Sequence, residues 1–183
     1  GLDFDIEAGQ SPQVIAQLVQ RIAAAHAAYP GLRFSLTLAT LANNNGASTA
    51  QSLGGGAPDS GNSYGDTTMA AVHAACCTGA SYVTVNLMTM DYGAPSPGVC
   101  VVAGGACDMG QSALQAAYNL HDHWNVPWSN IELTPMIGGN DVAGEQFTLA
   151  DADEVAAFAI AHQLAGVHYW SYDRDVDCPP GSA

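Results

Sequence analysis

The sequence predicts an α/β protein built around a parallel sheet, and three observations support this fold class. Strand-like and helix-like segments alternate along the chain, which is typical of parallel strands joined by right-handed helical crossovers. No Gly-rich phosphate-binding motif follows any strand, and this favours a barrel over a nucleotide-binding open sheet. Polar residues gather directly after predicted strands, where the active sites of such folds lie: Asp5 and Glu7, Asp91 and Tyr92, Asn140 and Asp141, and Tyr172 and Asp173.

The opening segment, GLDFDIE, predicts a strand with one acidic face. Side chains alternate between the two faces of a strand, so Asp3, Asp5 and Glu7 share one face while apolar residues occupy the other. Like charges at this spacing repel one another, and apolar neighbours suggest burial; both effects raise the pKa of a carboxyl group. Crowded acids of this kind suit proton transfer near neutral pH, although structural networks of acids produce the same pattern.

A helix is predicted over residues 13–29, directly after the opening strand. Ser11 is a suitable N-cap and Pro12 suits the first helical position, while apolar residues recur at helical spacing up to Pro30 and Gly31, which end the pattern. The first strand and this helix form one βα unit.

The rest of the chain repeats this alternation. Residues 41–66 are rich in Asn, Gly and Ser and predict a long loop, which is usually functional or mobile at such a length. The helix over 148–165 has Thr148 as its N-cap. The remaining predicted strands cover residues 33–40, 81–93, 131–137 and 166–173, and the other predicted helices cover 67–78 and 109–124.

The composition excludes several classes of partner. With three Lys and Arg against 17 Asp and Glu, the net charge is −14, so no basic surface is expected for nucleic acid or for anionic membranes. No apolar run approaches the length of a bilayer span, and no signal-peptide pattern opens the chain. If the protein is secreted, its signal was removed or lies outside this chain.

The five cysteines favour disulfide bonding over metal binding. Neither a CxxC motif nor a histidine at zinc-ligand spacing is present, so no metal site is predicted. Cys100 and Cys107 flank a Gly-rich turn and are suited to closing a short loop in an oxidising compartment. The odd count leaves one thiol free or paired outside the chain, and the connectivity stays open.

Three segments together resemble the signatures of glycoside hydrolase family 18, the chitinase family. GLDFDIE resembles the fourth-strand signature that ends in the catalytic acid, here without its leading Asp; LMTMDYG resembles the sixth-strand signature, and YWSYDRD the eighth-strand segment. They occur in the family's order from one end of the chain to the other. The resemblance implies a (β/α)8 TIM barrel, of which this chain covers about strands 4 to 8.

The same resemblance implies that residues 1–183 are a partial catalytic barrel domain, with strands 1 to 3 missing from this chain. Because five parallel strands cannot close a barrel, we expect an N-terminal barrel half as a partner, from the same gene product or from a second chain. That half also offers a partner for an unpaired cysteine. A secreted protein is expected.

The resemblance assigns the three stacked acids their roles. Glu7 is expected to be the general acid and base, Asp5 to orient the 2-acetamido group of the substrate, and Asp3 to be the buried acid that couples to Asp5. Enzymes of this family retain configuration without a protein nucleophile, because the acetamido carbonyl attacks the anomeric carbon. A neutral Glu7 beside an ionised Asp5 requires coupled pKa values, which stacked acids supply.

The resemblance also implies substrate contacts and neither cofactor nor metal. Asp91 matches the sixth-strand Asp that holds the acetamido group, and Trp170 matches the tryptophan under the sugar ring, with a plain core residue as its alternative. Met90 stands where the family has Tyr. Tyr92 is a candidate substitute, although a one-residue shift on a strand reverses the face. Met90 and Met136 are expected beside the substrate, and barrel packing is the alternative for such methionines.

The leading functional hypothesis is a chitinase that cleaves β-1,4 bonds inside chitin or chito-oligosaccharides. An endo-β-N-acetylglucosaminidase that acts on glycoprotein glycans would use the same acids. A lectin on an inactive barrel is a different class, which the presence of Glu7 disfavours. An open-sheet binding module is the remaining alternative.

Overall fold

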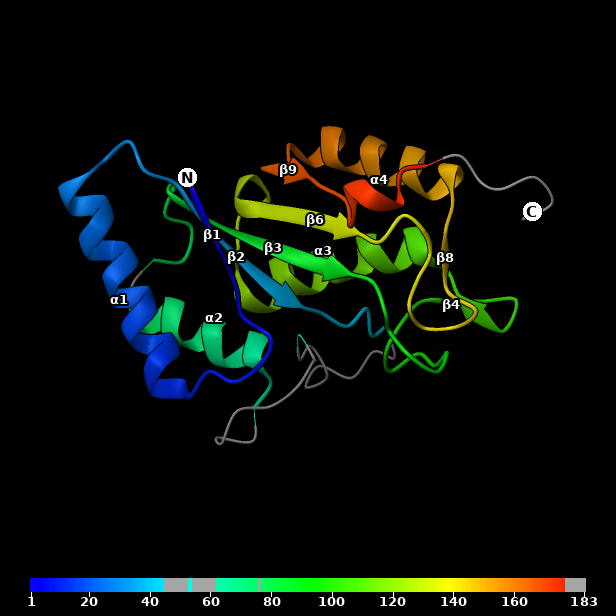
Figure 1. The fold of residues 1–183 in the computed structure, drawn as a ribbon, viewed down its shortest axis with the longest axis horizontal. Helices are drawn as coiled ribbons and strands as arrows, with labels where there is room; N and C mark the ends of the chain where they lie inside the picture. The colour runs from blue at the N-terminus through cyan, green and yellow to red at the C-terminus, as the bar shows by residue number, and fades with distance from the viewer. Residues whose placement is uncertain (45–52, 54–61, 76, 177–183) are drawn as a thin grey trace.

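The computed structural model describes residues 1–44, 53, 62–75 and 77–176, so most of the predicted loop over 41–66 lies outside the described residues. A five-stranded parallel sheet forms the centre of the molecule (Figure 1). Its strands lie in the order β1 (Leu2–Asp5), β2 (Phe34–Ala39), β3 (Val83–Thr89), β6 (Ile131–Pro135) and β9 (Gly166–Val167). The predicted parallel α/β sheet is therefore confirmed.

Within the described ranges, four α-helices alternate with these strands: α1 (Pro12–Ala28), α2 (Tyr64–Ala74), α3 (Met109–Trp124) and α4 (Leu149–His162). In Figure 1, α3 lies behind β3 and β6, and it packs against both strands. Helix α1 packs against α2, and α3 packs against α4. In the described part of the chain, none of these helices has the length and apolar character needed to cross a bilayer.

The strands bury apolar side chains on one face and carry polar ones on the other. In β2, Leu36 and Leu38 are fully buried in the core, while the intervening Ser35 and Thr37 line a cavity. This is the period-two alternation of a strand with two different faces. The sheet therefore divides the molecule into a dry core and a polar concave surface.

The five strands do not close into a barrel, as expected for a chain that covers only about strands 4 to 8 of one. Within the described residues β1 pairs only with β2, and β9 pairs only with β6, so the sheet is open at both edges. Five strands are too few to bring these edges together, because a barrel of this type needs eight. The described residues therefore form an open parallel α/β sheet.

Several element bounds differ from the predictions because local contacts shift them. Helix α2 begins at Tyr64 rather than residue 67, because the Ser63 side chain accepts a hydrogen bond from the Asp66 amide and so caps an earlier turn. The last predicted strand, 166–173, is only two residues long in β9, followed by a single parallel bridge between Met136 and Trp170. The predicted N-caps Ser11 and Thr148 are confirmed.

Short strands and 3-10 turns lie in the loops between the main strands and helices. Two small antiparallel ladders join β4 (Val102–Ala103) to β5 (Ala106–Cys107) and β7 (Gly138–Gly139) to β8 (Gln146–Phe147), and 3-10 turns occur at Trp128–Asn130 and Tyr172–Arg174. The predicted disulfide between Cys100 and Cys107 is present beside the first ladder. Cys77 is buried and free, while Cys76 and Cys178 lie outside the described residues.

Candidate active site

A cavity of about 960 Å³ occupies the concave face of the sheet. Residues of β1, β2, β3 and β6 and residues that flank the five strands on both sides line it, so it extends along the sheet and includes the carboxyl edge, where functional residues are predicted to meet. Of the eight predicted site residues, the cavity is lined by Asp3, Asp5, Glu7, Met90, Asp91 and Trp170. Tyr92 and Met136 do not line it.

The three acids follow one another along β1 and its continuation. Asp3 Oδ1 accepts a hydrogen bond of 2.8 Å from the hydroxyl of Thr37 on the neighbouring strand. Partial burial, and then the charge of Asp3, raise the pKa of Asp5. Partial burial, and then the charge of Asp5, raise the pKa of Glu7. The acids therefore influence one another's ionisation in sequence along the strand.

The burial of these acids is only partial, because all three side chains stay largely open to solvent, which is less burial than predicted. The predicted burial rested on apolar neighbours, but the apolar residues face away from the acids and only Ile6 among them is fully buried. β1 is an edge strand, so one side of the acid row has no strand beside it in the described chain. The acid row lies at the open margin of the cavity.

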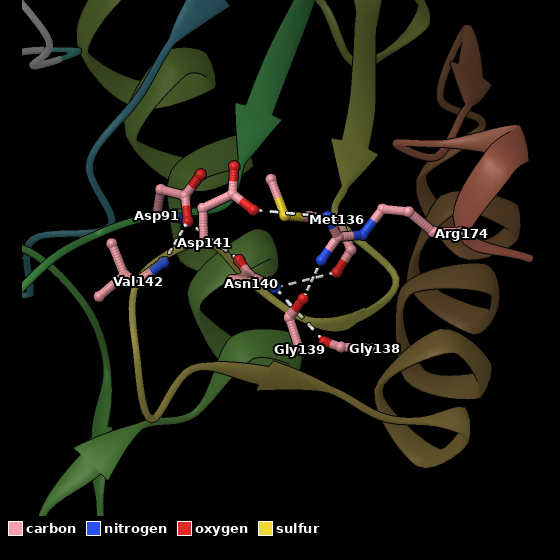
Figure 2. Close-up of polar contacts among 8 residues, drawn as sticks. All are labelled: Asp91, Met136, Gly138, Gly139, Asn140, Asp141, Val142 and Arg174. Carbon is pink, nitrogen blue, oxygen red and sulfur yellow. Dashed lines mark hydrogen bonds and ion pairs between the residues drawn. The ribbon is translucent and has the colours of Figure 1, made fainter. Parts of the chain in front are cut away.

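Asp91 follows β3 and is held at the cavity by the loop after β6. Its backbone N–H donates to Asn140 Oδ1 at 3.2 Å, and its carboxylate accepts from the Val142 amide at 2.9 Å (Figure 2). The residue has a positive φ of 52°, which Asp adopts more readily than most side chains. These two hydrogen bonds fix the turn, and the second of them engages one of the two carboxylate oxygens.

Tyr92 and Met136 are packing residues in this structure. Tyr92 is only 5% exposed, and burial, followed by the charge of Glu145, raises the pKa of its hydroxyl. Met136 is 2% exposed at the bridge to Trp170. The turn at Asp91 sends the next side chain into the core, so Tyr92 does not reach the cavity. The packing alternative for Met136 agrees with its burial, whereas Met90 lines the cavity.

Glu145 is a residue that sequence reasoning missed. Its carboxylate is 4% exposed and accepts hydrogen bonds from the Tyr92 amide at 3.1 Å and the Gly93 amide at 2.8 Å. Burial raises the pKa of Glu145, and the two backbone hydrogen bonds act against that rise. Glu145 therefore anchors the turn that presents Asp91. No local pattern marks it, because its partners lie about 50 positions away in the chain.

Replacing Glu145 by Gln is expected to loosen this turn. An amide in place of the carboxylate presents an N–H group to at least one backbone N–H, so one buried donor loses its acceptor at a cost of about 1–3 kcal/mol in the free energy of unfolding. Urea unfolding measures that loss, and hydrogen exchange at the Gly93 amide should accelerate. An unchanged unfolding free energy together with unchanged exchange at Gly93 would contradict the anchoring role.

Trp170 stands exposed at the cavity rather than in the core. Its side chain is 55% exposed, and its backbone is held by hydrogen bonds to Pro135 and from Ile137 at 2.8 and 2.9 Å. The predicted alternative of a plain core residue therefore does not describe it. Nearby, the Arg174 guanidinium donates to Asp141 Oδ1 at 3.4 Å and to the Gly139 carbonyl (Figure 2). This ties the chain after Trp170 to the loop after β6.

Polar side chains across the cavity floor were also missed. Ser35 Oγ donates to Glu132 Oε2 at 3.1 Å, and the same carboxylate oxygen lies 3.3 Å from His168 Nε2. A second row joins Thr134, Asn86 and Thr37. The signal was present in the sequence, because polar residues alternate with buried apolar ones in all three inner strands.

Among the residues that the structure describes, one group of carboxylates lies close enough to hold a metal ion: Asp108, Asp151 and Glu154, outside the cavity. Asp108 caps α3 by accepting from the Gln111 amide at 2.9 Å, and Asp151 accepts from the Gly110 amide at 3.2 Å. Glu154 accepts from the Gln111 side chain. Each of the three carboxylates therefore has a hydrogen-bond partner in the first turn of α3, with Asp108 as its N-cap.

The cavity on the open parallel sheet thus carries a row of neighbouring carboxylic acids and an exposed tryptophan. Comparison with known proteins points to chitinases. The chain is 38% identical over 109 residues to a probable bifunctional chitinase/lysozyme of Escherichia coli (strain K12) and, again at 38% over 109 residues, to Endochitinase 11 of Metarhizium anisopliae. No family model matches the chain.

A solved structure is similar over almost the whole chain. It is a catalytic-site mutant of active domain 2 of a thermostable chitinase from Pyrococcus furiosus, complexed with chito-oligosaccharides, with a TM-score of 0.67 and 26% identity. The match covers 99% of this chain and 52% of that one, whereas each curated match covers 54% of this chain and 12% or 20% of the relative. The predicted resemblance to chitinases is confirmed, and these similarities support a glycoside hydrolase.

Proposed function

We propose that this chain is part of the catalytic domain of an endo-acting chitinase of glycoside hydrolase family 18, with the cavity as its sugar-binding site. The observation that carries the proposal is the row of Asp3, Asp5 and Glu7 on the cavity, in which burial and neighbouring charges raise the pKa values of both Asp5 and Glu7. A carboxyl group with a raised pKa keeps its proton closer to neutral pH, as a general acid must.

In the proposed mechanism, Glu7 donates its proton to the glycosidic oxygen as the bond from that oxygen to the anomeric carbon breaks. The carbonyl oxygen of the substrate's acetamido group bonds to the anomeric carbon and forms an oxazolinium ion. Asp5 orients the acetamido group and stabilises the positive charge on its nitrogen. Water then attacks the anomeric carbon as the bond from that carbon to the acetamido oxygen breaks, and the water gives a proton to Glu7, which restores the enzyme and leaves a product of retained configuration.

Asp91 is proposed to hold the acetamido group from the side opposite Asp5. Two hydrogen bonds support this role, because they fix Asp91 at the cavity. Its N–H donates to Asn140, and one of its carboxylate oxygens accepts from the Val142 amide, which leaves part of the carboxylate for a ligand. The burial of Tyr92 leaves Asp91 without an adjacent tyrosine hydroxyl, so Met90 supplies only apolar contact at that position.

Trp170→Ala is expected to weaken oligosaccharide binding by about 10- to 100-fold, because an aromatic platform under a sugar ring is lost. The measurement is calorimetric titration of chito-oligosaccharides into the Glu7→Gln variant, which does not consume the ligand. Trp170→Phe is the matched control and should keep most of the affinity. Equal affinities for the Ala variant and the parent would exclude the platform role.

We further propose that the working catalytic domain includes more strands than this sheet, as a partial barrel of about strands 4 to 8 requires. The support is the open edge at β1, where Leu2 is 52% exposed, and the 52% share of the solved chitinase chain that is matched. The chain alone is expected to lack hydrolytic activity, and adding the segment that supplies the other strands should restore it. An extracellular location is proposed from the disulfide.

The function is tested by incubating the complete protein with chito-oligosaccharides and following the products by proton NMR. A chitinase with the proposed mechanism yields shorter oligosaccharides that appear first as the β anomer. Release of glycans from a glycoprotein with no cleavage of chito-oligosaccharides would instead identify an endo-β-N-acetylglucosaminidase. Binding without any cleavage would identify a lectin.

A further inference from the structure

The chain bends directly after β1, at the residue proposed as the general acid. Glu7, Ala8 and Gly9 form this bend and are all exposed, so the packing of their side chains does little to hold it. Gly9 has a positive φ of 82°, a conformation that glycine adopts without strain. A Cβ atom at Gly9 would meet no described residue within 4 Å beyond its chain neighbours. The bend therefore needs contacts with other elements to keep one conformation.

Two long-range hydrogen bonds supply these contacts, one on each side of Glu7. Before it, the Ile6 amide donates to the Thr37 carbonyl on β2 at 3.0 Å, and the Ile6 side chain is buried. After it, the Gly9 amide donates to the hydroxyl oxygen of Tyr64, which begins α2, at 2.9 Å. In the described part of the chain no hydrogen bond reaches the carboxylate of Glu7 itself, so these two backbone bonds determine where it lies.

Tyr64 is itself held firmly at the first position of α2. Its side chain is 9% exposed and belongs to the hydrophobic core. Ser63 caps the helix, and the Tyr64 carbonyl accepts from the Thr68 hydroxyl at 2.8 Å. The next residue, Gly65, packs closely, because a Cβ atom there would lie 2.5 Å from the Leu53 Cβ. The start of α2 is thus a fixed base from which the Tyr64 hydroxyl reaches the bend.

We propose that Tyr64 is a positioning residue for the general acid: by accepting the hydrogen bond from Gly9, its hydroxyl holds the bend so that the Glu7 carboxyl reaches the glycosidic oxygen. The proposal rests on the proposed function, because it concerns the same acid. Tyr64 does not line the cavity, so it acts through the backbone of the bend and not by contact with the substrate. A general acid must lie within hydrogen-bond reach of the atom that it protonates, and a displacement of about 1 Å is enough to slow a reaction strongly.

The first test is Tyr64→Phe in the complete protein, with kcat and KM measured on chito-oligosaccharides. Phe keeps the ring in the core and removes only the hydroxyl, and water can bind the freed N–H of the exposed Gly9, so the thermal midpoint should change little. We expect kcat to fall about tenfold while KM stays within about twofold, because the loss arises in the transition state and not in binding. An unchanged kcat would overturn the proposal.

Tyr82→Phe is the matched control. Tyr82 is partly buried, its hydroxyl lies 3.6 Å from Cys77 Sγ, and it does not line the cavity. This variant should keep the parent's kcat and KM. A fall in kcat equal to that of Tyr64→Phe would show that any lost tyrosine hydroxyl has this effect, and it would also overturn the proposal.

The leaving group of the substrate separates lost positioning of the acid from a general structural defect. A dinitrophenyl chito-oligosaccharide releases a stable phenolate and needs little proton donation, so its cleavage depends weakly on the general acid. Tyr64→Phe should therefore keep nearly the parent's kcat/KM on this substrate. In a Glu7→Gln background, Tyr64→Phe should cause no further loss on the unsubstituted oligosaccharide, because the acid that it positions is gone. Equal losses on both substrates, or the same loss in both backgrounds, would overturn the proposal.

Gly9→Ala tests the same bend if Tyr64→Phe folds poorly. It leaves the core and Tyr64 intact, but it places a side chain at a positive φ and so strains the bend. It should lower kcat on chito-oligosaccharides more than kcat/KM on the dinitrophenyl substrate. Full activity of Gly9→Ala on both substrates would show that the bend does not position Glu7. A parent whose hydrolysis does not depend on Glu7 would instead refute the proposed function.

Discussion

Glu7→Gln is expected to lower the turnover of chito-oligosaccharides by about two to four orders of magnitude, the range typical for loss of a general acid. Gln has nearly the same shape as Glu but has no proton of suitable acidity to give to the leaving oxygen. Because the change is isosteric and Glu7 is exposed at the cavity, folding and ligand affinity should be little altered. Steady-state kinetics and calorimetric binding, carried out on the same preparation, measure the two effects separately.

Glu154→Gln is the matched control for this substitution, since Glu154 lies on α4 away from the cavity. It should retain the parent's turnover. If Glu7→Gln also retained near-normal turnover, Glu7 would not be the acid, and the motif resemblance would no longer justify the mechanism. A loss of both turnover and affinity would point to a disturbed cavity, and thermal unfolding of the variant would then show a lowered midpoint.

Asp5→Asn is expected to reduce turnover by roughly 100-fold and to move the basic limb of the pH profile to lower pH. Burial is the first cause of the raised pKa of Glu7, and the charge of Asp5 is the second. Removing that charge lets Glu7 lose its proton at a lower pH, so the fraction of protonated general acid falls earlier as the pH rises. The lost turnover reflects the acetamido group, which loses its charged partner.

The profile is measured as kcat against pH with substrate saturating, so that it reports the enzyme–substrate complex. Asp153→Asn, an exposed position on α4, is the matched control and should leave both limbs unchanged. A basic limb that stays in place in Asp5→Asn would contradict the coupling between Asp5 and Glu7, even if turnover fell. A basic limb that moves to higher pH would mean that the charge of Asp5 lowers the pKa of Glu7 instead of raising it.

Local signals in the sequence predicted much of the fold. The 3.6-residue pattern predicted α3 with the bounds that the structure has, and side-chain caps at Ser11 and Thr148 predicted where two helices begin. These features depend on neighbours within a few positions. The last strand was predicted too long, because its apolar and aromatic residues suit a strand while only Gly166–Val167 pairs continuously with β6.

The sequence predicted residues of the cavity only where a period-two pattern places their side chains on one face of a strand. This reasoning placed the acids of β1 together, but it did not predict that an edge strand leaves them exposed. Residues such as Glu145 and Asn86 act through partners about 50 positions away, and a single sequence carries no trace of such pairs. Tyr92 shows the same limit, since the turn at Asp91 depends on contacts with the distant loop.

The side of the cavity that carries Asp91 is assembled from segments that leave the ribosome at different times. Its bonds join Asp91 to Asn140 and Val142, 49 and 51 positions later, and the loop is tied again by Arg174, 33 positions beyond Asp141. Each βα unit can form as it is synthesised, but these bonds can form only after Val142 and then Arg174 have been added. A nascent chain halted before Arg174 would carry most of its sheet and an unfinished site, so acquisition of structure and acquisition of ligand binding are separate events during biosynthesis.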